Sequence, residues 1–164
     1  MEEKKFTFNE VIDIYSGIEK ITGYTEADCF DFNYAIARNH DKAKSVFNSL
    51  SRMTNEINKP CAEFDAKKTE AMRKYSNGKH IVLPNGAVNW QVQKEHEDTC
   101  AKEIQKLAET YKEQIEERKT KHEAYILKLD QECTDFVPYL IDKDKLPKNL
   151  ASEHFRIIFS LIKE

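Results

Sequence analysis

Two stretches of this chain repeat side chains at intervals of three and four residues, which is the spacing of a coiled-coil seam. The first seam consists of Phe47, Leu50, Thr54, Ile57, Cys61, Phe64, Lys68, Ala71 and Tyr75. The second consists of Ile104, Leu107, Tyr111, Ile115, Arg118, His122, Tyr125, Leu129 and Cys133. Most of these residues are apolar, so the two seams predict long helices over residues 33–75 and 91–133.

A proline distinguishes the two predicted helices. Pro60 lies inside the first, where it removes a backbone hydrogen bond and clashes with the preceding turn. We therefore expect a kink or a break near Asn58–Pro60. The second helix contains neither glycine nor proline, so we expect it to be continuous.

The segment 76–90 between the two helices has the pattern of a β-hairpin. Ile81-Val82-Leu83 and Ala87-Val88 are β-prone runs on either side of Pro84-Asn85-Gly86. Asn-Gly favours a tight turn because both residues tolerate a positive φ. With so short a connection, the two long helices should fold back as an antiparallel pair.

Charge is consistent with this pairing. Residues 33–75 carry nine Lys/Arg and five Asp/Glu, whereas residues 93–132 carry eight Lys/Arg and eleven Asp/Glu. Opposite net charges favour facing helices. Two independently solvated helix faces explain the same counts equally well.

Shorter elements flank the predicted pair. Residues 6–23 form an expected N-terminal helix that begins with a Thr7–Glu10 capping box and stops at Gly23. Thr25 to Phe32 is expected to be a connector or a short turn of helix. In residues 136–164, Phe136–Ile141 can form a short strand, which Pro138 confines to an edge or to an irregular stretch, and Asn149 can cap a final helix. The predicted fold is a mostly α single domain, 1–164, in which the terminal helices pack at the base of the helical hairpin.

Composition excludes several classes of protein. Charged residues make up 34% and apolar residues 40% of the chain, so a thin seam is easier to bury than a thick core. The net charge is −3 and no basic run stands out, which argues against a nucleic-acid partner. No export signal or bilayer-length apolar run is present, so we expect a soluble cytoplasmic protein with no membrane partner.

The sequence contains no recognisable catalytic or metal-binding motif. His96 and Cys100 share a helix face, but two ligands do not make a metal site. Cys29, Cys61, Cys100 and Cys133 are too far apart in sequence for local zinc pairs and read as reduced core thiols. A Cys29–Cys133 contact at the base is an open alternative. We expect no enzyme activity, no cofactor and no bound metal.

The best candidate site is a partner-binding surface around the hairpin. It consists of Tyr75, Lys79, His80 and Trp90, because Trp and Tyr dominate binding hot spots. The alternative is that Tyr75 and Trp90 merely cap the end of the helical seam.

The order of motifs resembles a family of small uncharacterised proteins of tailed bacteriophages and prophages. The matching motifs run along nearly the whole chain: Ala37-Arg38-Asn39, Lys74-Tyr75, Asn77-Gly78 to Asn85-Gly86, Val137 to Ile141, Leu146-Pro147 and Ile157 to Glu164. The cysteines and Pro60 depart from the family pattern. The resemblance implies a phage origin but no mechanism. The order of helices and hairpin is also similar to that of a prefoldin subunit, at the level of architecture alone.

Three functions follow as hypotheses. The first is a non-enzymatic phage or prophage protein that binds a host or virion-assembly protein. The second is a prefoldin-like holdase or assembly chaperone. The third is an oligomeric small-ligand binder or enzyme with a pocket between subunits, suggested by Arg118 and His122 in the second seam. Thin helical arms also favour self-association into a homo-oligomer.

Overall fold

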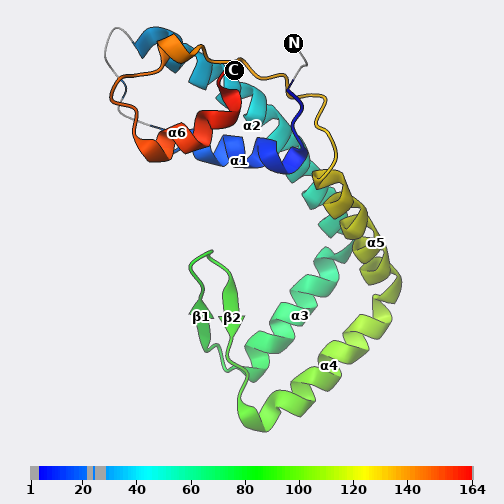
Figure 1. Cartoon of the computed structure of the whole chain (residues 1–164). Helices are drawn as coiled ribbons and strands as arrows, with labels where there is room; N and C mark the ends of the chain where they lie inside the picture. The colour runs from blue at the N-terminus through cyan, green and yellow to red at the C-terminus, as the bar shows by residue number, and fades with distance from the viewer. Residues whose placement is uncertain (1–3, 22–23, 25–28, 164) are drawn as a thin grey trace. The chain divides into compact units, whose positions relative to one another are not determined.

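The computed structural model describes residues 4–21, 24 and 29–163, and over these ranges the protein is mostly α-helical with one small β-hairpin (Figure 1). The chain divides into two compact units, which are described separately. Unit 1 comprises residues 1–53 and 124–164, and unit 2 comprises residues 54–123. Two helices contain the points of division: α2 (Phe30–Asn58) and α5 (Lys112–Leu129).

In unit 1, α1 (Phe8–Ile18) begins at the predicted capping box. The Glu10 backbone N–H donates to the Thr7 hydroxyl oxygen at 3.3 Å, and the Thr7 backbone N–H donates to the Glu10 carboxylate at 2.7 Å. Phe6 and Val11, on either side of the cap, are both buried. The helix ends at Ile18, earlier than predicted, and Gly23 lies outside the described residues.

The helices of unit 1 enclose its hydrophobic core. α1 packs on α6 (Ser152–Ile158), and the two approach closely at Gly17 and Ile157. The core is made of buried residues from α1, the first half of α2 and the C-terminal segment, with Phe32, Ile141, Ile158, Leu161 and Val11 the largest fully buried apolar side chains. The terminal helices therefore lie together in unit 1, as predicted.

The C-terminal segment of unit 1 decides between the two alternatives for residues 136–141 and corrects the predicted cap of the last helix. Residues 136–141 do not form a strand; Ile141 makes one isolated bridge with Ile162. Pro138 has no N–H to donate, which interrupts strand pairing here. Asn149 does not cap the last helix, because α6 begins only at Ser152, after an N-cap at Ala151.

In unit 2, α3 (Ala62–Tyr75) and α4 (Glu97–Thr110) pack side by side as an antiparallel pair (Figure 1). The first seam is buried at Ile57, Cys61, Phe64 and Ala71. The second seam is only half-buried from Ile104 to Arg118, so the pair has a thin core. The predicted helical hairpin is confirmed.

The break at Pro60 is also confirmed. α2 ends at Asn58, Lys59–Cys61 form a 3₁₀ turn, and α3 begins at Ala62.

The second predicted helix, 91–133, is wrong in its continuity and its length. It starts at Glu97 after a 3₁₀ turn, is interrupted at Tyr111 between α4 and α5, and ends at Leu129. The two interruptions face each other, because the Cys61 thiol donates to the Gln114 carbonyl at 3.1 Å. The interruption at Tyr111 thus lies beside the turn at Pro60 in the partner helix.

The hairpin is present as predicted, with β1 (His80–Val82) antiparallel to β2 (Val88–Trp90). The Gly86 N–H donates to the Leu83 carbonyl at 2.8 Å, and the Leu83 N–H donates to the Ala87 carbonyl at 2.8 Å. Only Gly86 has a positive φ, of 79°; Asn85 does not. The turn is therefore a Pro84-Asn85 turn closed by a glycine bulge, rather than a turn with both residues at positive φ.

Candidate interaction surface

The hairpin begins where α3 is closed by a Schellman motif. The Gly78 N–H donates to the Arg73 carbonyl and the Asn77 N–H to the Lys74 carbonyl, and Asn77 takes the left-handed conformation with φ 51°. The Gln93 N–H donates to the Tyr75 carbonyl at 3.1 Å where the chain returns from β2. Both ends of the hairpin are thus fastened to the end of α3.

Tyr75 joins α3 to α4 and does not belong to the hairpin surface. Its hydroxyl donates to the Glu103 carboxylate at 2.7 Å and accepts from the Lys74 ammonium at 3.2 Å. The hydrogen bond from Tyr75, aided by Lys74, lowers the pKa of the Glu103 carboxyl. The hydrogen bond to Tyr75 and the pairing with Glu103 raise the pKa of Lys74. This predicted site residue therefore has a structural role at the closed end of the helix pair.

His80 and Trp90 do come together, because they are directly opposite across the two strands. Their ring centroids lie 5.1 Å apart. His80 Nδ1 lies 2.9 Å from the Gly78 carbonyl oxygen, which can only accept, so Nδ1 carries the proton. Lys79, the fourth predicted residue, is exposed and immediately precedes β1.

The most exposed apolar residues of the hairpin are aliphatic, and they were missing from the predicted site. The exposed fractions are 53% for Ile81, 60% for Val82, 41% for Leu83 and 46% for Val88. Side chains alternate along a strand, so Val82, Val88, His80 and Trp90 share one face of the hairpin. That face is apolar or aromatic throughout.

One sequence signal could have located this surface. Residues 80–93 contain no Lys, Arg, Asp or Glu, and no other stretch of the chain without these residues is as long. In a chain that is 34% charged, an exposed segment without charge is unusual. Because surface segments normally keep their charges, this absence makes the hairpin the candidate interaction surface.

Polar residues of the second seam are engaged within unit 2. The Arg118 guanidinium lies 2.6 Å from the Asp65 carboxylate. The Arg118 side chain is 25% exposed and the Asp65 side chain 47% exposed. Lys67 donates to the Tyr111 hydroxyl at 2.8 Å. His122 is exposed. Arg118 on α5 is thus paired with Asp65 on α3, and setting the register of paired helices is the ordinary role of a polar residue in a seam.

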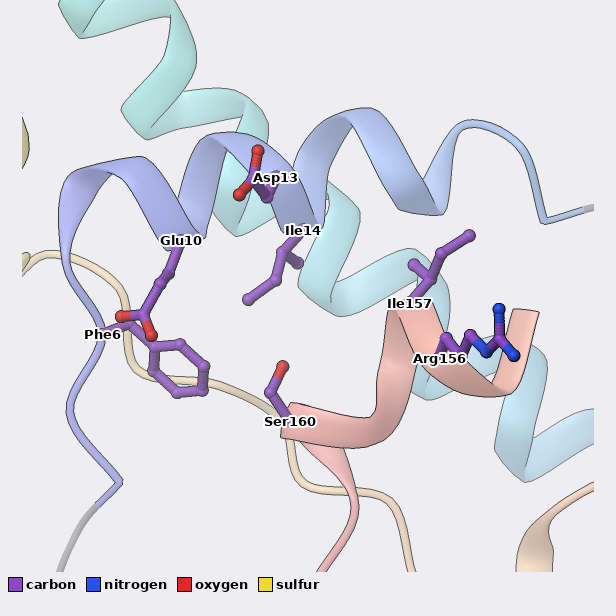
Figure 2. A pocket seen from close by; sticks show the side chains of 7 residues that line it. All are labelled: Phe6, Glu10, Asp13, Ile14, Arg156, Ile157 and Ser160. Carbon is purple, nitrogen blue, oxygen red and sulfur yellow. The ribbon is translucent and has the colours of Figure 1, made fainter. Parts of the chain in front are cut away.

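Unit 1 has a groove of about 340 Å³ between α1 and the end of α6, lined by Phe6, Glu10, Asp13, Ile14, Arg156, Ile157 and Ser160. Figure 2 shows Ile14 and Ile157 pointing between the two helices and the Glu10 carboxyl group directed toward Phe6. Glu10 is already occupied by the capping box. Within the described ranges, Asp13 and Arg156 form no ion pair.

Within the described chain, the cysteines form no disulfide and His96 belongs to no cluster of metal-binding side chains. Cys29, Cys61, Cys100 and Cys133 are all buried and none takes part in a disulfide, so no Cys29–Cys133 disulfide is formed. Cys100 is buried, whereas His96 is exposed and its ring lies 5.8 Å from the Tyr75 ring at an interplanar angle of 52°. Among the described residues, no three His, Cys, Asp or Glu side chains gather as a potential metal site.

No protein-family model matches the chain, and no curated protein or solved structure matches it either. In the described part of the chain, none of the helices is long and apolar enough to cross a lipid bilayer.

Proposed function

We propose that this chain is a non-enzymatic protein-interaction protein, encoded by a phage or prophage, that binds a host or virion-assembly protein through its hairpin. The phage origin rests on the sequence resemblance alone. The interaction rests on one observation, the exposure of Ile81, Val82, Leu83 and Val88 in the longest uncharged stretch of a highly charged chain. Exposed apolar surface of this kind marks interaction sites in proteins that otherwise keep such patches small.

The geometry suits a protein partner better than a small ligand. The face formed by His80, Val82, Val88 and Trp90 is a strand surface rather than a cavity. A flat apolar face with an aromatic residue at one end provides the kind of central contact that dominates protein interfaces. Its lack of charge means that binding removes no charged group from water.

An affinity capture with matched variants tests the proposal. The tagged chain is incubated with lysates of phage-infected and uninfected bacteria, beside V82K/V88K and a variant with residues 79–89 replaced by a Gly/Ser turn. The control is L127K, because Leu127 is 68% exposed but lies in unit 1. We expect a protein that is retained by the wild type and L127K and lost from both hairpin variants. Equal retention by all variants, or no retained protein, would contradict the proposal.

A prefoldin-like holdase is the second candidate. The same exposed aliphatic side chains could hold apolar segments of unfolded proteins without regard to sequence. A molar excess of the chain should then suppress the aggregation of a heated client protein, and V82K/V88K should suppress it less. No effect of the wild type at molar excess would eliminate this candidate. The inter-subunit ligand site remains a prediction with no observation in its favour.

A further inference from the structure

The outer edge of β1 has unpaired backbone groups with a regular spacing. The pairs Leu83–Ala87 and Lys79–Gln91 are hydrogen-bonded across the hairpin. In an antiparallel ladder such pairs alternate with pairs that are not hydrogen-bonded, so the N–H and C=O groups of His80 and Val82 point away from β2. Within the described chain, no hydrogen bond satisfies these four groups.

This edge lacks the protection that exposed strand edges normally carry. Natural edges are blunted by lysines, prolines inside the strand or a covering element. β1 is exposed along its whole length, and Lys79 and Pro84 lie outside the strand on either side. A two-stranded hairpin is only marginally stable by itself, whereas a sheet of three or more strands with an apolar face can be stable on its own. The hairpin therefore favours the addition of a strand.

We propose that this strand is β1 of a second copy of the chain, paired antiparallel about a two-fold axis at Ile81. In this register His80 of each copy lies opposite Val82 of the other, and their outward N–H and C=O groups form mutual hydrogen bonds. A two-fold contact of this kind is self-complementary, so pairing through β1 joins two copies into a dimer.

Charge favours a second copy in this register. The only Lys, Arg, Asp or Glu beside β1 is Lys79, which falls opposite Leu83 of the other copy. The two lysines then lie at opposite ends of the paired strands, and no like charges face each other.

The resulting four-stranded sheet carries His80, Val82, Val88 and Trp90 of both copies on one face. Edge pairing thus doubles the apolar face without covering it, and the inference requires no particular partner protein.

The test is the oligomeric state of the full chain by sedimentation equilibrium over a range of concentrations. We expect a monomer–dimer equilibrium in the wild type. V82P removes the outward N–H from β1 and should weaken the dimer by about tenfold or more, since one hydrogen bond is lost from each copy. V88P makes the same change directly across the hairpin, on the outer edge of β2, and should leave dimerisation nearly unchanged.

A cross-link provides a second reading that does not depend on how proline is tolerated. In the proposed register Ile81 lies opposite its own copy at a separation of about 4.5 Å between Cα atoms. I81C should therefore form a covalent dimer under mild oxidation, whereas N89C, across from it on β2, should not. A wild type that stays monomeric at every concentration, equal effects of V82P and V88P, or equal cross-linking of I81C and N89C would overturn the proposal.

Discussion

The side chain of Asn39 forms two hydrogen bonds with the backbone of Tyr139, a hundred residues later in the chain. Its amide nitrogen donates to the Tyr139 carbonyl at 2.8 Å, and its amide oxygen accepts from the Tyr139 N–H at 2.8 Å. Asn39 is fully buried in α2. The Asn39 amide thus forms the two backbone hydrogen bonds that a neighbouring strand would otherwise make with Tyr139. It holds the segment 137–141 against α2 without a sheet.

Removing this amide should destabilise unit 1. N39A leaves the N–H and C=O of Tyr139 without partners, at a cost of about 2–4 kcal/mol in the free energy of unfolding. Urea unfolding followed by circular dichroism measures the change. N48A is the control on the same helix, because Asn48 is exposed. Equal stabilities of N39A and N48A would show that the two hydrogen bonds contribute little.

Gly17 should not tolerate a methyl group. A Cβ at this position would lie 2.5 Å from Cγ2 of Ile157 on α6, so G17A should cost about 1–3 kcal/mol through overpacking. The change should reverse sign in an I157A background, because alanine is otherwise the better helix residue by about 0.5–1 kcal/mol. A double-mutant cycle of thermal or urea unfolding measures this coupling. Additive effects would refute close α1–α6 contact at this point.

Acid should weaken unit 2 through Glu103. Its pKa is lowered in the folded state, chiefly by the Tyr75 hydrogen bond, so the folded chain favours the ionised form. The stabilisation is complete above the ordinary value of 4.5 and disappears as pH falls through the lowered value. E103Q should cost about 0.5–1 kcal/mol at neutral pH, since the pair is partly exposed, and progressively less in acid. The control is E109Q, on the same helix; a pH-independent difference would contradict the assignment.

The thiols should be unreactive until the chain unfolds. All four cysteines are buried, and burial raises the pKa of Cys100 and Cys133, which further reduces the reactive thiolate. Mass spectrometry after brief alkylation should find no modified thiol in the native protein and four in denaturant. S49C adds an exposed thiol and should be labelled once in the native state. Rapid labelling of the native wild type would show that one of the buried sites opens readily.

Elements encoded by neighbouring residues could be predicted from the sequence. The Thr7–Glu10 capping box, the break at Pro60 and the hairpin around Gly86 each depend on a few adjacent side chains. Features that depend on distant residues could not. No glycine or proline near Tyr111 indicates an interruption, and nothing near Asn39 indicates that it binds Tyr139.

The candidate site was predicted only in part, for a similar reason. Aromatic and polar residues drew attention to the hairpin, and the structure does bring His80 and Trp90 together. Tyr75 is close in sequence but is committed to Glu103 across the helix pair. The exposure of Ile81, Val82, Leu83 and Val88 could not be inferred from apolar character, because apolar strand residues are ordinarily expected to be covered.

The division of the chain also determines the order in which the protein can fold during synthesis. Unit 2 is a single continuous segment, whereas unit 1 is assembled from residues on both sides of it. On the ribosome, residues 54–123 emerge and can pair while α1 and the start of α2 still lack the residues that complete their core. The bonds from Asn39 to Tyr139 and from Tyr24 to His154 form only after the last part of the chain has emerged. The apolar residues that the N-terminal part contributes to the core of unit 1 therefore stay exposed while the intervening segment is translated. This is the interval in which the nascent chain is most vulnerable to aggregation.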